Sequence, residues 1–253
     1  MGVLLFDNTD DVVRFTTLAG PLASVGDGAW TVAVLAKMNT TGDWNAVAYL
    51  LSGGGATQAG FSYNASVTRL YVDVGSGSTF GTFVPNATDT FIFAVSKATG
   101  TVAPRLGVKN LTTGSAWAHE AGSLGIANAA ASSSLEIGVW QGTSDPFGGW
   151  VGLCGWWEGD MSDGQKETLS TNKQTSDWWN HSFAVPKFLS QLNVSTPSDL
   201  AGNATGLDIS NLPTLDAGET LENWNFDGTG PVVGPAINPD YSRFPRHHLR
   251  RSR

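Results

Sequence analysis

The sequence contains little cysteine, little charge and no long hydrophobic run, and each shortage excludes a class of protein. Cys154 is the single cysteine in 253 residues, so no disulfide can form within the chain. No apolar run reaches the length of about 18 residues that a membrane-spanning helix needs, so we expect no membrane partner. Charged residues make up 14% of the chain, against roughly 25% in average soluble domains. With 41% hydrophobic residues, the chain can nevertheless form a substantial core.

The motifs of several enzyme classes are absent as well. The sequence has no G-x-S-x-G nucleophile elbow, no phosphate loop and no dinucleotide fingerprint. The four histidines, His119, His181, His247 and His248, do not form a zinc-ligand spacing with Cys154. Because Cys154 lies in an apolar stretch, we expect an inert core residue and not a nucleophile.

What the chain does contain is glycine, tryptophan and many short apolar stretches. Its 10 tryptophans are expected in cores or at recognition surfaces, since each ring is large and mostly apolar. The apolar stretches recur at intervals of about ten residues, separated by Gly-rich turns, which is typical of a β-sandwich or jelly roll. The predicted strands are 3–17 (a strand, or a hairpin around an acidic turn), 31–37, 44–51, 60–63, 69–74, 79–84, 90–96, 104–110, 115–121 and 134–140.

The stretch from Phe147 to Leu169 is predicted to be a buried strand followed by a short helix. Its glycines allow close approach of neighbouring backbones. Its tryptophans, Trp150, Trp156 and Trp157, are expected to pack in the interior. After the strand, Ser162 or Asp163 is expected to cap a helix whose first turn includes Gln165.

This stretch resembles the closing motif of the concanavalin A-like lectin/glucanase superfamily in its laminin-G-like form. The matching residues are Phe147, Gly149, Val151, Leu153, Trp156, Trp157, Met161, Ser162 and Gln165. Residues 5–13 resemble the opening strand of such domains, and residues 30–37 resemble a later strand. The resemblance covers roughly the first two-thirds of the chain and implies an all-β fold, an antiparallel β-sandwich of the jelly-roll type.

Three parts are predicted along the chain. They are a laminin-G-like sandwich at 1–175, a loop-rich extension at 176–230 and an extended arm rich in Pro and Arg at 231–253. The extension is expected to pack on the sandwich or on a neighbouring subunit, with Trp178 and Trp179 sealing that contact. Residues 219–227 are expected to add one more strand.

Charge is distributed unevenly between the body and the end of the chain. Residues 1–240 carry a net charge of −13, and residues 241–253 carry +5. The acidic body is expected to repel nucleic acid. For the basic arm, a solvated tail and a nucleic-acid arm remain alternatives, but we favour an anchor on an acidic neighbour in an assembly. The residues expected to make this contact are Arg243, Phe244, Arg246, Leu249, Arg250, Arg251 and Arg253.

The resembling superfamily contains glycosidases, whose activity depends on paired carboxylates. A retaining glycosidase needs two carboxylates roughly 5 Å apart across the scissile bond. The nearest phrase, 158–163, lacks the final Glu of the family pattern and is interpreted as a solvated acidic turn, so no catalytic residue is predicted. Carbohydrate binding needs aromatic platforms beside amides and carboxylates. The candidates are Trp44, Trp117, Trp140 and Asp145, with core packing as the competing interpretation of each tryptophan.

Calcium is the cofactor that the resemblance implies. Oxygen-rich loops could supply ligands, and the candidates are Asp7, Asp10, Asp160 and Asp163. No EF-hand spacing is present, so no cofactor is predicted and calcium stays an alternative.

A laminin-G-like domain with a leaderless start and a basic arm resembles the minor tail or surface-displayed proteins of bacteriophages. We therefore expect a non-enzymatic virion structural protein, made in the host cytoplasm, whose lectin-like domain adheres to host cell-wall glycans. Its expected partners are other virion proteins and further copies of itself. The alternatives are a glycosidase or free lectin of the same superfamily, and a capsid decoration protein.

Overall fold

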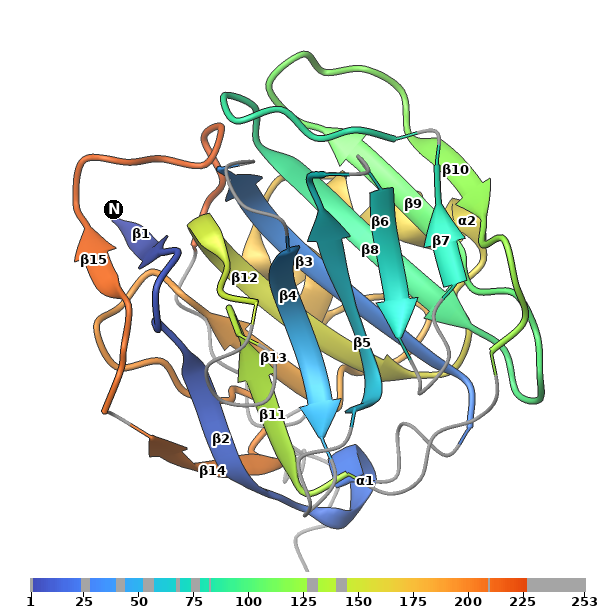
Figure 1. Cartoon of the computed structure of the whole chain (residues 1–253), viewed down its shortest axis with the longest axis horizontal. Helices are drawn as coiled ribbons and strands as arrows, with labels where there is room; N and C mark the ends of the chain where they lie inside the picture. The colour runs from blue at the N-terminus through green and yellow to red at the C-terminus, as the bar shows by residue number, and fades with distance from the viewer. Residues whose placement is uncertain are drawn as a thin grey trace, which may run out of the picture.

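The chain forms two antiparallel β-sheets packed face to face, as seen in the computed structural model (Figure 1). The structure describes residues 2–23, 28–39, 44–51, 57–66, 69–73, 78–81, 83–126, 132–139, 145–208 and 210–226. The arm predicted at 231–253 lies outside these residues. No helix within the described ranges has the length and apolar character of a membrane-spanning segment. The all-β antiparallel sandwich predicted from the sequence is confirmed.

Sheet A contains eight of the described strands in the order β10-β9-β8-β3-β12-β1-β15, with β13 also paired to β12. Its strands are β1 (Val3–Asp7), β3 (Trp30–Met38), β8 (Phe91–Lys97), β9 (Arg105–Asn110), β10 (Ala118–Ala121), β12 (Gly148–Glu158), β13 (Phe188–Gln191) and β15 (Thr214–Asp216). The long strand β12 organises the sheet. It pairs with β3 along one edge, and along the other it pairs first with β1 and then with β13.

Sheet B contains the seven other described strands in the order β14-β2-β11-β4-β5-β6-β7. They are β2 (Val13–Leu18), β4 (Trp44–Leu51), β5 (Thr57–Asn64), β6 (Arg69–Asp73), β7 (Ser78–Phe80), β11 (Ser134–Ile137) and β14 (Ala204–Asp208). The described helices are short: α1 (Gly20–Ala23), α2 (Asp163–Glu167), the 3-10 turn η2 (Thr168–Ser170) and α3 (Thr175–Trp179).

The hairpin considered for residues 3–17 is wrong. Strand β1 belongs to sheet A and β2 to sheet B, so the acidic connection between them crosses from one sheet to the other. The reason is that Phe6 and Phe15 both fill the core between the sheets. Two strands that face each other across a core cannot also pair edge to edge.

The main core lies between the two sheets and is rich in aromatic side chains. Trp30 and Trp156 are both fully buried there, with ring centroids 5.6 Å apart. Burying a large apolar side chain contributes about 1.5–3 kcal/mol, so these rings are a main source of stability. Cys154 lies in the same core, and burial raises the pKa of its thiol, which keeps it protonated. The inert cysteine expected from the sequence agrees with this position.

A second core covers the outer face of sheet A. Trp157 projects from β12 to this side and meets Trp178 of α3 at 5.8 Å between ring centroids. Trp178 in turn packs edge-on against Trp224 at 6.1 Å, and its indole N–H donates to the Leu169 carbonyl at 2.9 Å. The turn η2, helix α3 and residues 221–226 therefore close over sheet A, whereas β14 is the described piece of the extension that joins sheet B.

The extension is held together by one half-buried carboxylate. Asp199 accepts hydrogen bonds from the backbone N–H groups of Leu189, Ala201, Asn203 and Ala204. These residues belong to β13, to the turn after Asp199 and to the start of β14, so a single side chain links the strand added to sheet A with the strand added to sheet B. Satisfied acceptors of this kind favour one defined loop conformation.

The strand predicted over 219–227 does not form within its described part. Glu222 and Asn223 adopt positive φ angles of 49° and 58°, which turn the backbone out of an extended path. The apolar side chains Leu221, Trp224 and Phe226 instead pack on the outer face of sheet A. By contrast, the helix cap is confirmed: Ser162 and Gln165 form a capping box at the start of α2.

Candidate functional site

An aromatic patch lies on the outer face of sheet B, the face turned away from sheet A. It consists of Trp44, Asn64, Arg69 and Tyr71. Trp44 begins β4 and is 36% exposed, and its ring lies 4.7 Å from that of Tyr71 on β6. In the register Trp44 pairs with Asn64, and Asn64 pairs with Arg69. The patch thus combines an exposed indole with an amide, a phenol and an exposed guanidinium.

The direction of Trp44 follows from strand alternation. The next residue, Asn45, pairs with Tyr63, whose ring is buried in the core between the sheets. Successive side chains on a strand point to opposite faces, so Trp44 must face outward. The sequence alone could not decide between a platform and core packing for this residue, because that choice depends on the register between β4 and β5.

Asp145 lies beside the start of β4. Its carbonyl oxygen accepts the backbone N–H of Ala46 at 2.9 Å, and its φ of 53° belongs to the left-handed region. Burial raises the pKa of its carboxyl. The structure therefore brings Asp145 to the same end of sheet B as Trp44. The third predicted member, Trp140, lies outside the described residues.

Trp117 lies apart from the aromatic patch, on the other sheet. It precedes β10 of sheet A, and its ring stacks on that of His119 with an interplanar angle of 8°. Its indole N–H donates to the Ser170 hydroxyl at 3.2 Å. The ring is half-buried against η2, so its contacts are internal ones.

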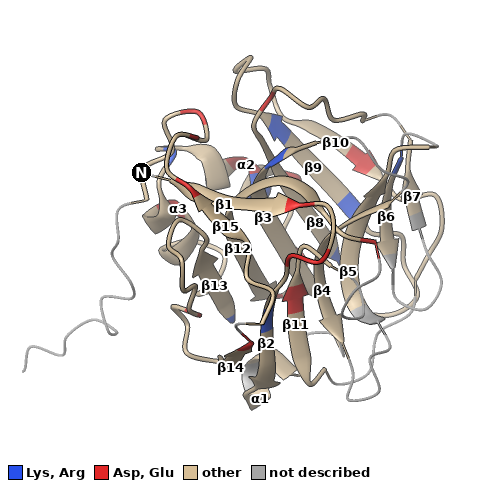
Figure 2. Cartoon of the chain, turned by 60° about the vertical axis from the view of Figure 1, so that its left-hand side comes forward, with Lys and Arg blue, Asp and Glu red and all other residues tan. Residues whose placement is uncertain are grey.

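Three carboxylates gather in the connection from β1 to β2, which Figure 2 shows in red. Asp7, Asp10 and Asp11 can each place one oxygen within 4.8 Å of the others. Asp11 Oδ2 accepts the backbone N–H of Asp7 at 2.8 Å, and burial together with the two neighbouring carboxylates raises the pKa of Asp11. Asp11 was not among the predicted ligands. Carboxylate oxygens at this spacing are the donor type that calcium prefers.

The other two predicted ligands, Asp160 and Asp163, face basic side chains. Asp160 Oδ1 lies 2.9 Å from Arg105 Nη2, and Asp163 Oδ1 lies 3.4 Å from Lys166 Nζ. Lys166 is fully buried, and its Nζ also donates to the Arg105 carbonyl at 3.1 Å. Burial lowers the pKa of Lys166 to about 8. This cluster joins α2 to β9, and sequence reasoning missed it because nothing in the spacing marks Lys166 as buried.

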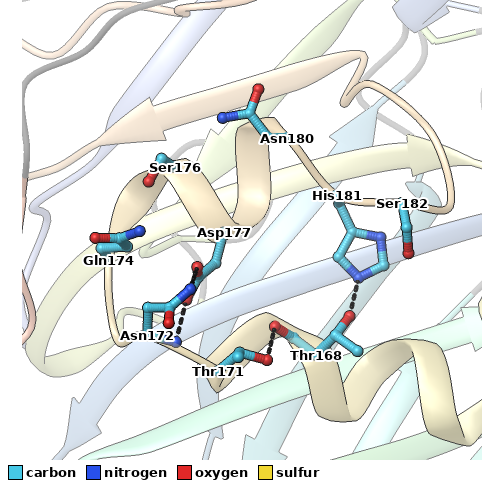
Figure 3. A pocket seen from close by; sticks show the side chains of 9 residues that line it. All are labelled: Thr168, Thr171, Asn172, Gln174, Ser176, Asp177, Asn180, His181 and Ser182. Atoms are coloured by element: carbon cyan, nitrogen blue, oxygen red, sulfur yellow. Dashed lines mark hydrogen bonds between the residues drawn. The ribbon is translucent and has the colours of Figure 1, made fainter.

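A polar pocket of about 370 Å³ opens between residues 168 and 182, among η2, α3 and the turns around them (Figure 3). Asp177 and Asn172 lie on one side of it, joined by two hydrogen bonds of 2.8 Å. His181 and Thr168 lie on the other side, 2.7 Å apart. Sequence reasoning missed the pocket because these residues form no motif.

The pair of Thr168 and His181 resembles a hydroxyl activated by an imidazole, but its hydrogen bonds oppose that role. His181 Nδ1 accepts the backbone N–H of Phe183 at 3.2 Å, so the ring proton resides on Nε2. Nε2 then donates to Thr168 Oγ1 and to the Gln165 carbonyl, the latter at 2.9 Å. Burial lowers the pKa of His181 and keeps it neutral. An imidazole that donates to the hydroxyl cannot take its proton.

No family model and no curated protein sequence matches the chain. Several solved structures resemble it at low identity. The full extracellular region of zebrafish Gpr126/Adgrg6 matches 68% of this chain with a TM-score of 0.50 and 13% identity. CBM40 of the Ruminococcus gnavus IT-sialidase, bound to α2,3-sialyllactose, matches 67% with a TM-score of 0.46 and 13% identity. Tailspike protein 2 of the Escherichia coli O157:H7 bacteriophage CAB120 matches 65% with a TM-score of 0.43 and 16% identity.

The matched region is 99% of CBM40, but only 23% of the zebrafish region and 23% of the tailspike. The chain therefore spans less than a quarter of those two proteins. At such identities the likeness shows the fold alone. The LG1-3 region of the laminin alpha2 chain is also among the similar structures, with a TM-score of 0.43 and 12% identity. The antiparallel β-sandwich predicted from the sequence is confirmed by the two sheets of the structure itself.

Proposed function

We propose that this protein adheres to carbohydrate through the aromatic patch on sheet B and does not turn its ligand over. The observation that carries the proposal is the ring of Trp44, 36% exposed and supported by Tyr71 at 4.7 Å. An indole on a surface is costly unless a ligand covers it, since its large apolar face is left in water. The apolar C–H face of a sugar ring fits that surface.

The groups around the rings supply the polar half of a sugar site. Asn64 and Arg69 pair with each other in the register beside Trp44, and Asp145 lies at the same end of the sheet. The exposed guanidinium of Arg69 and the carboxylate of Asp145 can hydrogen-bond sugar hydroxyls while the indole contacts the ring. The amide of Asn64 is buried and its oxygen accepts the Ser66 hydroxyl at 2.7 Å, so it supports the patch from beneath. Most of the described extension packs on sheet A, and β14 joins sheet B beside β2, so neither covers the strands β4, β5 and β6 that carry the patch.

Two features support adhesion over hydrolysis. On the outer face of sheet B, the carboxylate of Glu136 is bound to Arg14 at 2.6 Å, and Arg14 also contacts Asp208 at 3.1 Å. A carboxylate held by a guanidinium is occupied by that ion pair and is not free to approach a glycosidic bond. His181 is likewise committed as a hydrogen-bond donor.

The wider role that we propose is that of a virion structural protein, displayed on a bacteriophage tail or particle surface and bound to host cell-wall glycans. The charge asymmetry supports it: an acidic body with a basic end of +5 suits a module fastened to an acidic neighbour. Position on the capsid in place of the tail is the alternative within this proposal. The alternatives to a virion role are a free lectin and a glycosidase.

Glycan-array binding of the full chain, with and without calcium, tests the proposal. We expect Trp44→Ala to reduce binding at least tenfold, because the platform is lost. Trp117→Ala is the matched control, a tryptophan on the opposite sheet, and it should retain binding. Equal binding by the wild type and W44A would overturn the assignment of the patch. If shortened glycans are released during incubation, the protein cleaves its ligand, and the proposal that it only binds glycan is wrong.

A further inference from the structure

The polar pocket between residues 168 and 182 has the composition of a ligand site. Its volume of about 370 Å³ is at the lower end of the range of about 300–1,000 Å³ typical of small-molecule sites. Every described residue that lines it carries a hydroxyl, amide, carboxylate or imidazole group. Such a lining offers hydrogen bonds in many directions, and no purely apolar side chain is among the described residues that form it.

Part of this lining is held in place and part is unengaged. Asp177 is fixed by two hydrogen bonds from Asn172, so its carboxylate is a positioned acceptor. The side chains of Gln174, Ser176, Asn180 and Ser182 make no hydrogen bond to any described residue. A rigid acceptor surrounded by unengaged donors and acceptors is preorganised for a ligand with several hydroxyl groups.

Charge narrows the ligand class. Asp177 is the one charged group among the described lining residues, and no Lys or Arg is found among them. An anionic ligand, such as a sialylated or phosphorylated sugar, would therefore meet repulsion with no compensating cation. A neutral sugar can instead offer adjacent hydroxyls to the carboxylate.

We propose that this pocket is a second binding site, specific for one unit of a neutral sugar and independent of the aromatic patch. The pocket lies among η2, α3 and the adjoining turns, on the side of sheet A, whereas the patch lies on the outer face of sheet B. The two sites face opposite sides of the sandwich. One molecule can therefore engage two glycan chains, and linked weak sites raise avidity without any new contact.

Amide chemical-shift mapping of the full chain tests the inference, with the methyl glycosides of mannose, galactose and N-acetylglucosamine as neutral probes and α2,3-sialyllactose as the anionic one. We expect at least one neutral probe to shift the amides of residues 172–182, and sialyllactose to leave them unchanged. The double variant Asn180→Leu with Ser182→Ala should weaken that response at least tenfold. Both side chains are exposed, so the fold is expected to be kept, and the unchanged remaining spectrum verifies it.

Trp44→Ala separates this inference from the proposed function. We expect W44A to keep the response at 172–182 and to lose only the response around residues 44–71. If no neutral probe shifts residues 172–182, if sialyllactose does so, or if the double variant responds like the wild type, the pocket is not the site that we propose. If only the aromatic patch fails to bind sugar, the neutral probe should still shift the amides of residues 172–182.

Discussion

Lys166 shows how burial changes the chemistry of a single residue. Its ammonium group is packed between α2 and β9, and the absence of a Cβ on Gly107 makes room for its chain, since a Cβ there would lie 3.0 Å from Lys166 Cδ. Burial lowers its pKa from 10.5 to about 8, partly opposed by Asp163. A lowered lysine pKa means that the folded state binds fewer protons than the unfolded state between these two values. The contribution of this group to stability is therefore unfavourable below pH 8 and improves as the pH rises to 10.5.

The expected rise in stability with pH can be tested with Lys166→Met, which keeps the length of the side chain and removes its charge. We expect the stability of the wild type relative to K166M to rise between pH 7.5 and pH 10.5, by up to about 3 kcal/mol. Urea unfolding of both proteins at several pH values measures it. A difference that does not change with pH would show that Lys166 is solvated in the native state.

At the scale of elements, α2 depends on its cap. The Ser162 hydroxyl accepts the N–H of Gln165 at 3.3 Å, and the Gln165 side chain accepts the N–H of Ser162 at 2.8 Å. A helix of five residues has little stability of its own, so its cap and its packing on β9 hold it.

We expect Ser162→Ala to lower the free energy of unfolding by about 1 kcal/mol, since an N-cap acceptor is lost. Ser182→Ala is the matched control, because Ser182 is exposed and makes no hydrogen bond to a described residue. Chemical denaturation compares the two. Equal stability of S162A and S182A would mean that packing alone positions α2.

At the scale of the whole molecule, the basic arm is the part that the virion proposal depends on. Deleting residues 231–253 should abolish incorporation into particles while the sandwich stays folded. Circular dichroism of the truncated protein and its recovery in purified particles measure the two effects. Replacing the five arm arginines by Gln, with Phe244 and Leu249 kept, tests whether charge provides the attachment. Normal assembly of the truncated protein would overturn the anchor.

Neighbouring tryptophans show how far the sequence could predict this fold. Trp156 and Trp157 were both assigned to packing, and both are fully buried. They nevertheless lie in different cores, since alternation sends Trp156 between the sheets and Trp157 toward the extension. The second core could not be predicted, because it forms only when residues 178 and 224, distant in sequence, fold back over sheet A.

The all-β character, the positions of most strands and the cap of α2 can be predicted from the amino-acid sequence, because these depend on alternation and on neighbours a few residues apart. Three other features follow only from the three-dimensional fold: Trp44 faces solvent beside Tyr71, the β1–β2 connection changes sheets, and residues 168–182 line an open polar pocket. Each of these depends on strand register or on the docking of distant segments. A shift of one residue in register would reverse which side chains are buried, and local sequence does not specify that choice.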